Sequence, residues 1–350
     1  MKNLLISAVL LCTLSAHAQS VLTRSKGNSF NPSIGINALM LYKNGSEDID
    51  EDGFSLQELE LQFTSDVDAY FRAEARIALH QEESSEGGHS HEFNVDPEEV
   101  FVETISIPKF TLKAGKFYAN FGKYNMVHTH ALPFIYKGKV QETMFGHEGL
   151  SEVGLGASVL APLSWFSEFS FQILQPTNED LFVESHHSIS YVLKSKNLWD
   201  LSDSLTIEWG LSGLYFSHQE NIKEETQLYG SDLTLKWKPT QSSNHSSFMW
   251  STEFIHKERK GSISQKDQGL TSFIRYQLAS KWYAQAQYEH LDLEDSQNVN
   301  AYTGLLAFIP TEFSSVRVQF DSIHEKDAKA QKRISLQLNT SIGAHPAHVY

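Results

Sequence analysis

The feature that most constrains this chain is an alternation of polar and apolar residues that recurs from about residue 31 to the C-terminus. In the segment 71–79, charged residues occupy positions 72, 74 and 76, and apolar residues occupy the odd positions. Successive side chains of a β-strand point to opposite faces, so this pattern predicts strands with one polar, water-facing side and one apolar side. Repeated along a chain, such strands are typical of a transmembrane β-barrel.

The N-terminus has the composition of a secretory signal peptide. Lys2 supplies a positive charge, residues 4–14 are mostly apolar, and Ala16-His17-Ala18 is a small-x-small cleavage site. We therefore expect residues 1–18 to be removed and the mature chain, 19–350, to be exported. The single cysteine, Cys12, lies in the signal, so the mature protein would have no disulfide and no cysteine-based metal site.

The pattern predicts about sixteen strands, an even number, as single-chain bacterial barrels require. They are expected near 31–43, 53–65, 67–80, 97–107, 110–122, 151–162, 165–175, 182–195, 202–216, 227–240, 246–259, 268–279, 282–293, 299–309, 313–325 and 331–343. The connections are mostly long and short in turn. With both termini in the periplasm, long loops would lie outside the cell and short turns inside.

A soluble β-sandwich or β-rich enzyme is the alternative, because its strands also alternate. Two features favour the barrel. The loop lengths are asymmetric, and four tryptophans fall at or near the inner ends of the predicted strands, where an interfacial girdle belongs: Trp165, Trp199, Trp237 and Trp282. We therefore predict an all-β fold, an antiparallel transmembrane barrel in the outer membrane of a Gram-negative bacterium.

A barrel of about sixteen strands encloses water rather than a filled core, which predicts a porin for passive diffusion of small solutes or ions. The candidate pore-lining residues are Arg72, Glu74, Arg76, Glu99, Glu103, Lys116, Lys123, Lys137, Lys139, Lys236, Arg275, Arg317 and Arg333. Their signs are mixed, so the sequence leaves anion or cation selectivity open. The formal net charge of −15 argues against nucleic-acid binding.

The longest connection, 123–150, is the candidate constriction loop. Phe134, Ile135 and Phe145 would pack against the barrel wall, while Lys123, Lys137 and Lys139 would offer charge to the lumen. Loop length alone is equally compatible with an external flap.

Histidines are grouped at three places, two of which also offer a carboxylate. Paired imidazoles beside a carboxylate suit zinc, copper or nickel, although such pairs in polar loops are often only solvated. No cofactor is required by the predicted function, and Zn²⁺ is the metal we expect if one binds. The candidate ligands are His89, His91, Glu92, His128, His130, His147, Glu148, His345 and His348.

Several segments resemble a known family. They are Ala114-Gly115-Lys116-Phe117, Phe121-Gly122-Lys123, the run from His128 to Phe134, Gly146-His147-Glu148-Gly149-Leu150 and Gly343-Ala344-His345-Pro346-Ala347-His348. Together they resemble porin-like outer-membrane proteins related to the phosphate-selective porins, most closely a His-rich branch often labelled zinc-regulated outer-membrane receptors. The resemblance implies a pore with a constriction loop and a link to zinc. The loop itself offers lysines but no arginine, whereas bidentate phosphate binding favours arginine.

Two other classes of function stay open. One is a non-conducting barrel that acts as a metal receptor or as a structural component. The other is an outer-membrane hydrolase built on His186-His187-Ser188 or on Asp321 with His324, but no compact motif supports it and we expect no enzyme. The expected partners are outer-membrane lipids, small solutes or ions, further copies in a homotrimer, and the barrel-assembly machinery, which would read the C-terminal strand ending at Tyr350.

Overall fold

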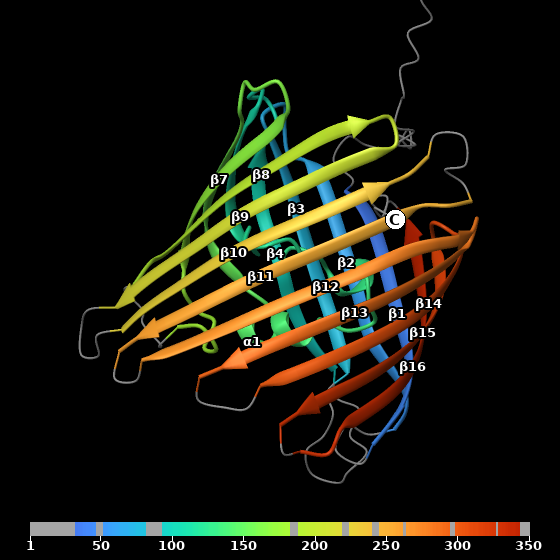
Figure 1. The fold of residues 1–350 in the computed structure, drawn as a ribbon. Helices are drawn as coiled ribbons and strands as arrows, with labels where there is room; N and C mark the ends of the chain where they lie inside the picture. Colours follow the sequence, from blue (N-terminus) through green and yellow to red (C-terminus); the bar gives the residue numbers. More distant parts are fainter. Residues whose placement is uncertain are drawn as a thin grey trace, which may run out of the picture.

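In the computed structural model the chain forms a closed barrel of sixteen antiparallel strands (Figure 1). The structure describes residues 32–46, 52–81, 93–182, 188–218, 224–239, 245–261, 264–294, 298–326 and 328–343. Each strand pairs with its neighbours in the chain, and β1 closes the ring against β16. The predicted fold class is thereby confirmed. The signal peptide and Tyr350 lie outside the described residues.

The strands have the following bounds: β1 Ser33–Gly45, β2 Gly53–Asp66, β3 Phe71–Gln81, β4 Phe93–Thr104, β5 Phe110–Tyr118, β6 Ser151–Leu160, β7 Phe166–Gln175, β8 Ser190–Ser202, β9 Leu205–His218, β10 Glu224–Trp237, β11 Phe248–Lys260, β12 Gln265–Ala279, β13 Trp282–Leu293, β14 Val299–Thr311, β15 Ser314–Glu325 and β16 Gln331–Gly343. Between β5 and β6 lie a 3₁₀ turn, η1 Thr129–Ala131, and a short helix, α1 Lys139–Phe145.

The barrel is polar inside and apolar outside. On β16, Ser335 and Gln337 are fully buried, whereas Ile334 is 50% exposed. A soluble sheet hides its apolar face, so this inverted pattern fits an aqueous lumen and a lipid-facing outer surface. Among the described residues, no helix is long and apolar enough to span a membrane.

Several predicted boundaries differ from the structure, including those of β5, of β8 and of the connection between β11 and β12. β8 begins at Ser190 and continues to Ser202, because the alternation runs on through Lys194 and Lys196. The connection expected at 257–268 is shorter, because β11 and β12 stay paired as far as Arg259 and Gln265. β5 ends at Tyr118, where the chain turns into the barrel.

Besides three register shifts next to short turns, two β-bulges interrupt the alternation within strands. In β4 the pairing passes from Glu99 to Pro97, so Glu98 is an extra residue without a partner on β3. In β2 the pairing likewise skips Gln57. A bulge changes which side chains share a face, and Glu98 and Glu99 are accordingly both buried.

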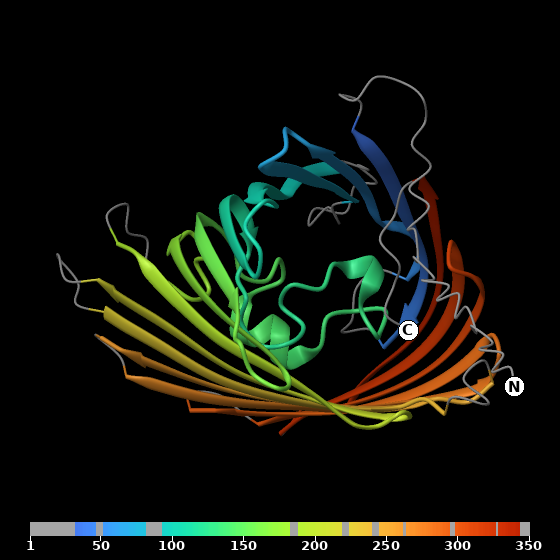
Figure 2. The ribbon, with the colours of Figure 1, turned by 90° about the horizontal axis from the view of Figure 1, so that it is seen from above.

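Residues 119–150 lie inside the ring of strands (Figure 2). One part of this segment packs Phe134 and Ile135 against Phe273 and Leu305 of the wall. Another part packs Phe145 into a second buried cluster, with ring centroids of Phe145 and Phe121 at 5.5 Å. The segment is therefore held by apolar contacts at both ends; its role as a constriction stays a prediction. We call residues 119–150 the inner loop.

A substitution of Gly115 tests the close contact between β5 and β4 beside this loop. Its φ is +137°, and a Cβ atom there would lie 2.2 Å from the carbonyl oxygen of Val100. We expect Gly115→Ala to lower the free energy of unfolding by about 1–3 kcal/mol, measured by heat-dependent gel mobility of the refolded barrel. Gly304→Ala, where a Cβ meets nothing within 4 Å, is the control. Equal effects of the two substitutions would contradict this account.

Candidate functional site

The barrel interior contains a cavity of about 550 Å³ between the inner loop and the opposite wall. The loop contributes residues 120–133 in part, and the wall contributes side chains from β2, β3 and every strand from β7 to β16. This volume admits small solutes together with water.

Cationic side chains dominate the cavity. Its cationic lining residues are Arg76, Lys123, Lys194, Lys196, Lys236, Arg275 and Arg317, and its acidic ones are Glu168 and Glu208. Glu208 pairs with Lys123 at 2.7 Å and lies 3.9 Å from Lys196. The wall of the cavity therefore carries an excess of positive charge, although the chain as a whole is acidic.

The residues predicted to line the pore fall into two groups. Five of them border the cavity: Arg76, Lys123, Lys236, Arg275 and Arg317. The others are placed elsewhere: Arg72 beside Asp66, Glu74 beside Arg76, Glu99 against His128, Glu103 opposite Arg72 in the ladder, Lys116 beside Asp96, Lys137 on the carbonyls of His147 and Glu148, Lys139 beside Glu142, and Arg333 between Asp321 and the ring of Tyr136.

Lys194 and Lys196 are cavity residues that sequence reasoning missed. Lys194 lay within the predicted strand, next to the outward-facing Leu193, so the alternation already placed it on the inward face. Lys196 lay beyond that strand, which was predicted to stop at residue 195, whereas β8 continues to Ser202. Extending the alternation by one inward position would have found it.

Buried carboxylates hold the inner loop to the wall. Glu253 of β11 accepts hydrogen bonds from the backbone amide of Lys123 at 2.6 Å and from Gln141 at 2.5 Å. Glu289 of β13 accepts the backbone amides of Lys139 at 3.0 Å and Val140 at 3.2 Å, which are the first amides of α1. The carboxylates thereby satisfy donors that a helix start leaves without partners.

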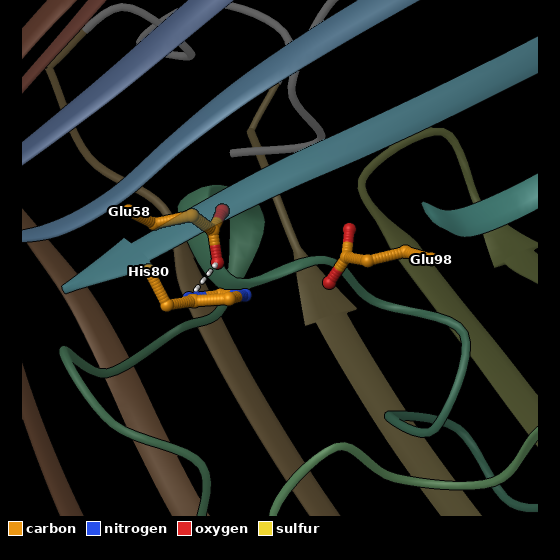
Figure 3. A group of neighbouring side chains, drawn as sticks. All are labelled: Glu58, His80 and Glu98. Carbon is orange, nitrogen blue, oxygen red and sulfur yellow. Dashed lines mark ion pairs between the residues drawn. The ribbon is translucent and has the colours of Figure 1, made fainter. Parts of the chain in front are cut away.

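A second site lies where the inner loop meets β2, β3 and β4. Six side chains come together there, and we call them the Glu–His cluster: Glu58, Glu60, His80, Glu98, His128 and His130. Three overlapping groups, Glu58/His80/Glu98, Glu58/Glu60/His130 and Glu60/Glu98/His128, place their potential ligand atoms within 4.8 Å of one another. Figure 3 shows the first of these groups.

His128 occupies the centre of the Glu–His cluster. Its Nδ1 lies 3.0 Å from Glu98 and 3.2 Å from Glu60, and its Nε2 lies 3.0 Å from Glu99. Burial opposes the charged imidazolium, but the interactions with these three carboxylates outweigh it and raise the pKa of His128 well above its usual range. Both ring nitrogens thus face negative charge.

The predicted metal ligands are only partly brought together. His128 and His130 lie in the Glu–His cluster, whereas His147 and Glu148 are exposed and belong to none of the potential metal groups among the described residues. The set that combined all four residues is therefore wrong. His89, His91, Glu92, His345 and His348 lie outside the described residues, as do His186 and His187.

The predicted hydrolytic pair of Asp321 with His324 is not formed. Asp321 accepts hydrogen bonds from Arg333 at 3.1 Å and from Thr303 at 2.9 Å. His324 contacts Ser322 at 2.9 Å instead.

Known proteins share this architecture at low sequence identity. The chain matches no family model. An uncharacterized protein of Aquifex aeolicus is 27% identical over 85% of this chain and 70% of its own length. OprB of Pseudomonas putida is 8% identical, with a TM-score of 0.62 over 89% of this chain and 94% of that chain.

Two further solved structures are similar. OmpF of Salmonella typhi is 9% identical, with a TM-score of 0.60 over 90% of this chain and 99% of that chain. An anion-selective porin from Comamonas acidovorans is 11% identical, with a TM-score of 0.57 over 89% and 100% of the two chains. These likenesses confirm a porin-like barrel fold; the resemblance to the His-rich branch stays a prediction.

A substitution of Glu289 tests whether this carboxylate holds the inner loop against the wall. Glu289→Gln removes one acceptor oxygen and the negative charge at the start of α1, and we expect the loop to detach more often at a cost of about 1–3 kcal/mol. Trypsin should then cut the folded barrel after Lys137 and Lys139 at least about fivefold faster. Glu103→Gln, on the inward face of β4, is the control. Unchanged cleavage in the Glu289 variant would show that this carboxylate does not hold the loop.

Proposed function

We propose that this protein is an outer-membrane porin through which small solutes diffuse passively, with a preference for anions. The observation that carries the proposal is the lining of the cavity, where seven cationic side chains face two acidic ones. Charged groups along a water-filled passage select ions of the opposite sign. The preference follows from these local charges and is independent of the net charge of the chain.

The outer surface supports the location of the pore in a membrane. Large apolar side chains of opposite sides of the barrel are exposed, including Leu155 of β6 at 61% and Leu336 of β16 at 43%. The inward neighbours of Leu336 on β16 are the polar residues Ser335 and Gln337. An apolar band around a closed barrel is stable in lipid and would cause association in water. Contact with outer-membrane lipids, the export signal and recognition by the assembly machinery belong to the same proposal.

The inner loop is the proposed constriction. It borders the cavity on one side through Lys123, Met126 and Pro133, and the cationic wall borders it on the other. A solute that crosses the barrel at this level would pass between the two. One similar structure, OmpT of Vibrio cholerae, is described in a trimer form, and we include a homotrimer in the proposal.

Ion selectivity in a planar bilayer tests the proposed function. Refolded mature protein in a gradient of potassium chloride should show discrete open steps and a zero-current potential whose sign reports chloride preference. Phosphate should also pass, because the arginines that its bidentate recognition favours come from the wall as Arg76, Arg275 and Arg317. Cation preference would overturn the selectivity, and a folded, inserted barrel that stays silent would favour the non-conducting receptor.

Two lysines of the cavity wall test the origin of the selectivity. A unit charge about 8 Å from a permeating ion in water contributes about 0.5 kcal/mol, with opposite sign for chloride and potassium, and salt screens this to about 0.2 kcal/mol. Lys196→Gln with Lys236→Gln should therefore reduce the chloride-to-potassium permeability ratio about fourfold. Lys238→Gln is the matched control, because Lys238 follows β10 and does not line the cavity. An unchanged ratio in the double variant would mean that other charges set the preference.

A further inference from the structure

We propose that the Glu–His cluster binds one divalent transition-metal cation, represented by zinc, with Glu60, Glu98 and His128 as its primary ligands. The cation would join the inner loop, which supplies His128, to the barrel wall, which supplies both carboxylates. This ligand set replaces the one expected from the sequence, because His147 and Glu148 are not part of it.

The local balance of charge calls for a cation. Glu58, Glu60 and Glu98 are 1%, 2% and 3% exposed, and burial of an ionised carboxylate is costly unless it is paired or coordinates a metal. Arg76 is the nearest arginine, but it serves Glu74 at 2.6 Å and lies 3.7 Å from Glu99. Lys137 approaches from the loop and donates to the carbonyls of His147 and Glu148.

The carboxylates Glu58, Glu60, Glu74, Glu98 and Glu99 thus outnumber the arginine and the lysine beside them, Arg76 and Lys137. The other titratable side chains there are His80, His128, His130, Tyr118 and Glu148. A divalent cation bound among these carboxylates would add positive charge to the set.

The distances between the ligand atoms are those of a coordination sphere. Glu60 Oε2 lies 3.2 Å from Nδ1 of His128 and 3.3 Å from Nδ1 of His130, yet it accepts no aligned hydrogen bond. In a tetrahedral zinc site with bonds of about 2.0–2.1 Å, neighbouring ligand atoms are about 3.3 Å apart. These atoms are therefore arranged as if around a common centre.

Glu58 is the second, independent sign of a ligand. Neither of its carboxylate oxygens makes a hydrogen bond with normal geometry, although the side chain of Thr129 lies beside it and His80 Nδ1 is 4.0 Å away. Figure 3 shows this carboxylate directed toward His80, with Glu98 across the same space. A fully buried, poorly satisfied carboxylate that points into a cluster of imidazoles and carboxylates indicates a missing cation.

The chemistry of the donors selects the class of metal. Calcium and magnesium prefer oxygen donors alone, whereas an imidazole with carboxylates suits zinc and its first-row neighbours. The carboxylates of Glu98 and Glu99 are also held in place, since Tyr118 donates its hydroxyl to Glu98 at 2.9 Å and its amide to Glu99 at 3.1 Å. His128 and His130 border the cavity, so an ion can reach them from the lumen.

Metal analysis of the refolded, full mature chain tests this inference without reference to transport. All proteins carry His89→Ala, His91→Ala, His345→Ala and His348→Ala, so that zinc held by those histidines is not counted. After refolding with zinc and desalting, we expect one zinc per chain. Glu60→Gln and Glu98→Gln should each weaken binding at least about tenfold, and Co²⁺ should give the intense visible bands of a tetrahedral site only in the parent.

Three comparisons keep the result interpretable. Glu103→Gln, on the same strand as Glu98, should bind zinc like the parent, and heat-dependent gel mobility reports whether each variant is folded. His147→Ala with Glu148→Gln should also leave binding unchanged. A folded parent that retains no zinc, or Glu60 and Glu98 variants that bind it equally well, would overturn the proposal.

The effect of the metal on the pore rests on the proposed function, but its binding does not. If the site braces the inner loop, zinc should slow trypsin cleavage within the loop in the parent and leave it unchanged in Glu60→Gln. Zinc binding by a barrel that does not conduct ions would contradict the porin proposal and support the metal site. Conductance without zinc binding would support the porin proposal and contradict the metal site.

Discussion

Closure of the sheet is the constraint on which the rest of this structure depends. A strand edge exposed to lipid leaves backbone groups without hydrogen bonds, and pairing of β1 with β16 removes that edge. Once the ring is closed and its outer face is apolar, every charged side chain of the strands must find a place inside or at the rims. The lumen therefore has to accommodate carboxylates and cations together, in a space narrowed by the inner loop.

The inner loop separates these charges by sign. Carboxylates of the wall are used to hold it: Glu253 and Glu289 accept its backbone amides, and Glu60, Glu98 and Glu99 surround His128. Cations such as Lys194, Lys236 and Arg275 remain at the cavity. An acidic chain can in this way present a basic passage, because its inward acids are occupied by the loop. The same contacts would make anchoring of the loop and the proposed selectivity two results of one arrangement.

Much of the fold was predictable because a strand's period of two is a local property. The segments of all sixteen strands and the inward side of Glu58, Glu60 and Arg333 follow from alternation alone. The proposed metal ligands did not follow from it. Glu98 stands next to Glu99 in the sequence, and alternation places adjacent residues on opposite faces, whereas the bulge turns both inward. Pairing of His128 with β2 and β4 depends on how the loop folds across the lumen, and no spacing in the sequence encodes it.

Each of the two bulges changes which positions of its strand, odd or even, face the lumen. Gln57 uses its extra position to donate to the carbonyl of Ile135 at 2.9 Å, and Glu98 uses its own to reach His128. Loss of Glu98 or Gln57 would remove the bulge and leave the rest of each ladder paired as before, so every other side chain would keep its face. Loss of one residue elsewhere in these strands would turn the following apolar side chains to water and charges to lipid until the next turn. Each bulge therefore adds one residue that the ladder does not need for pairing, and both of these residues reach the inner loop.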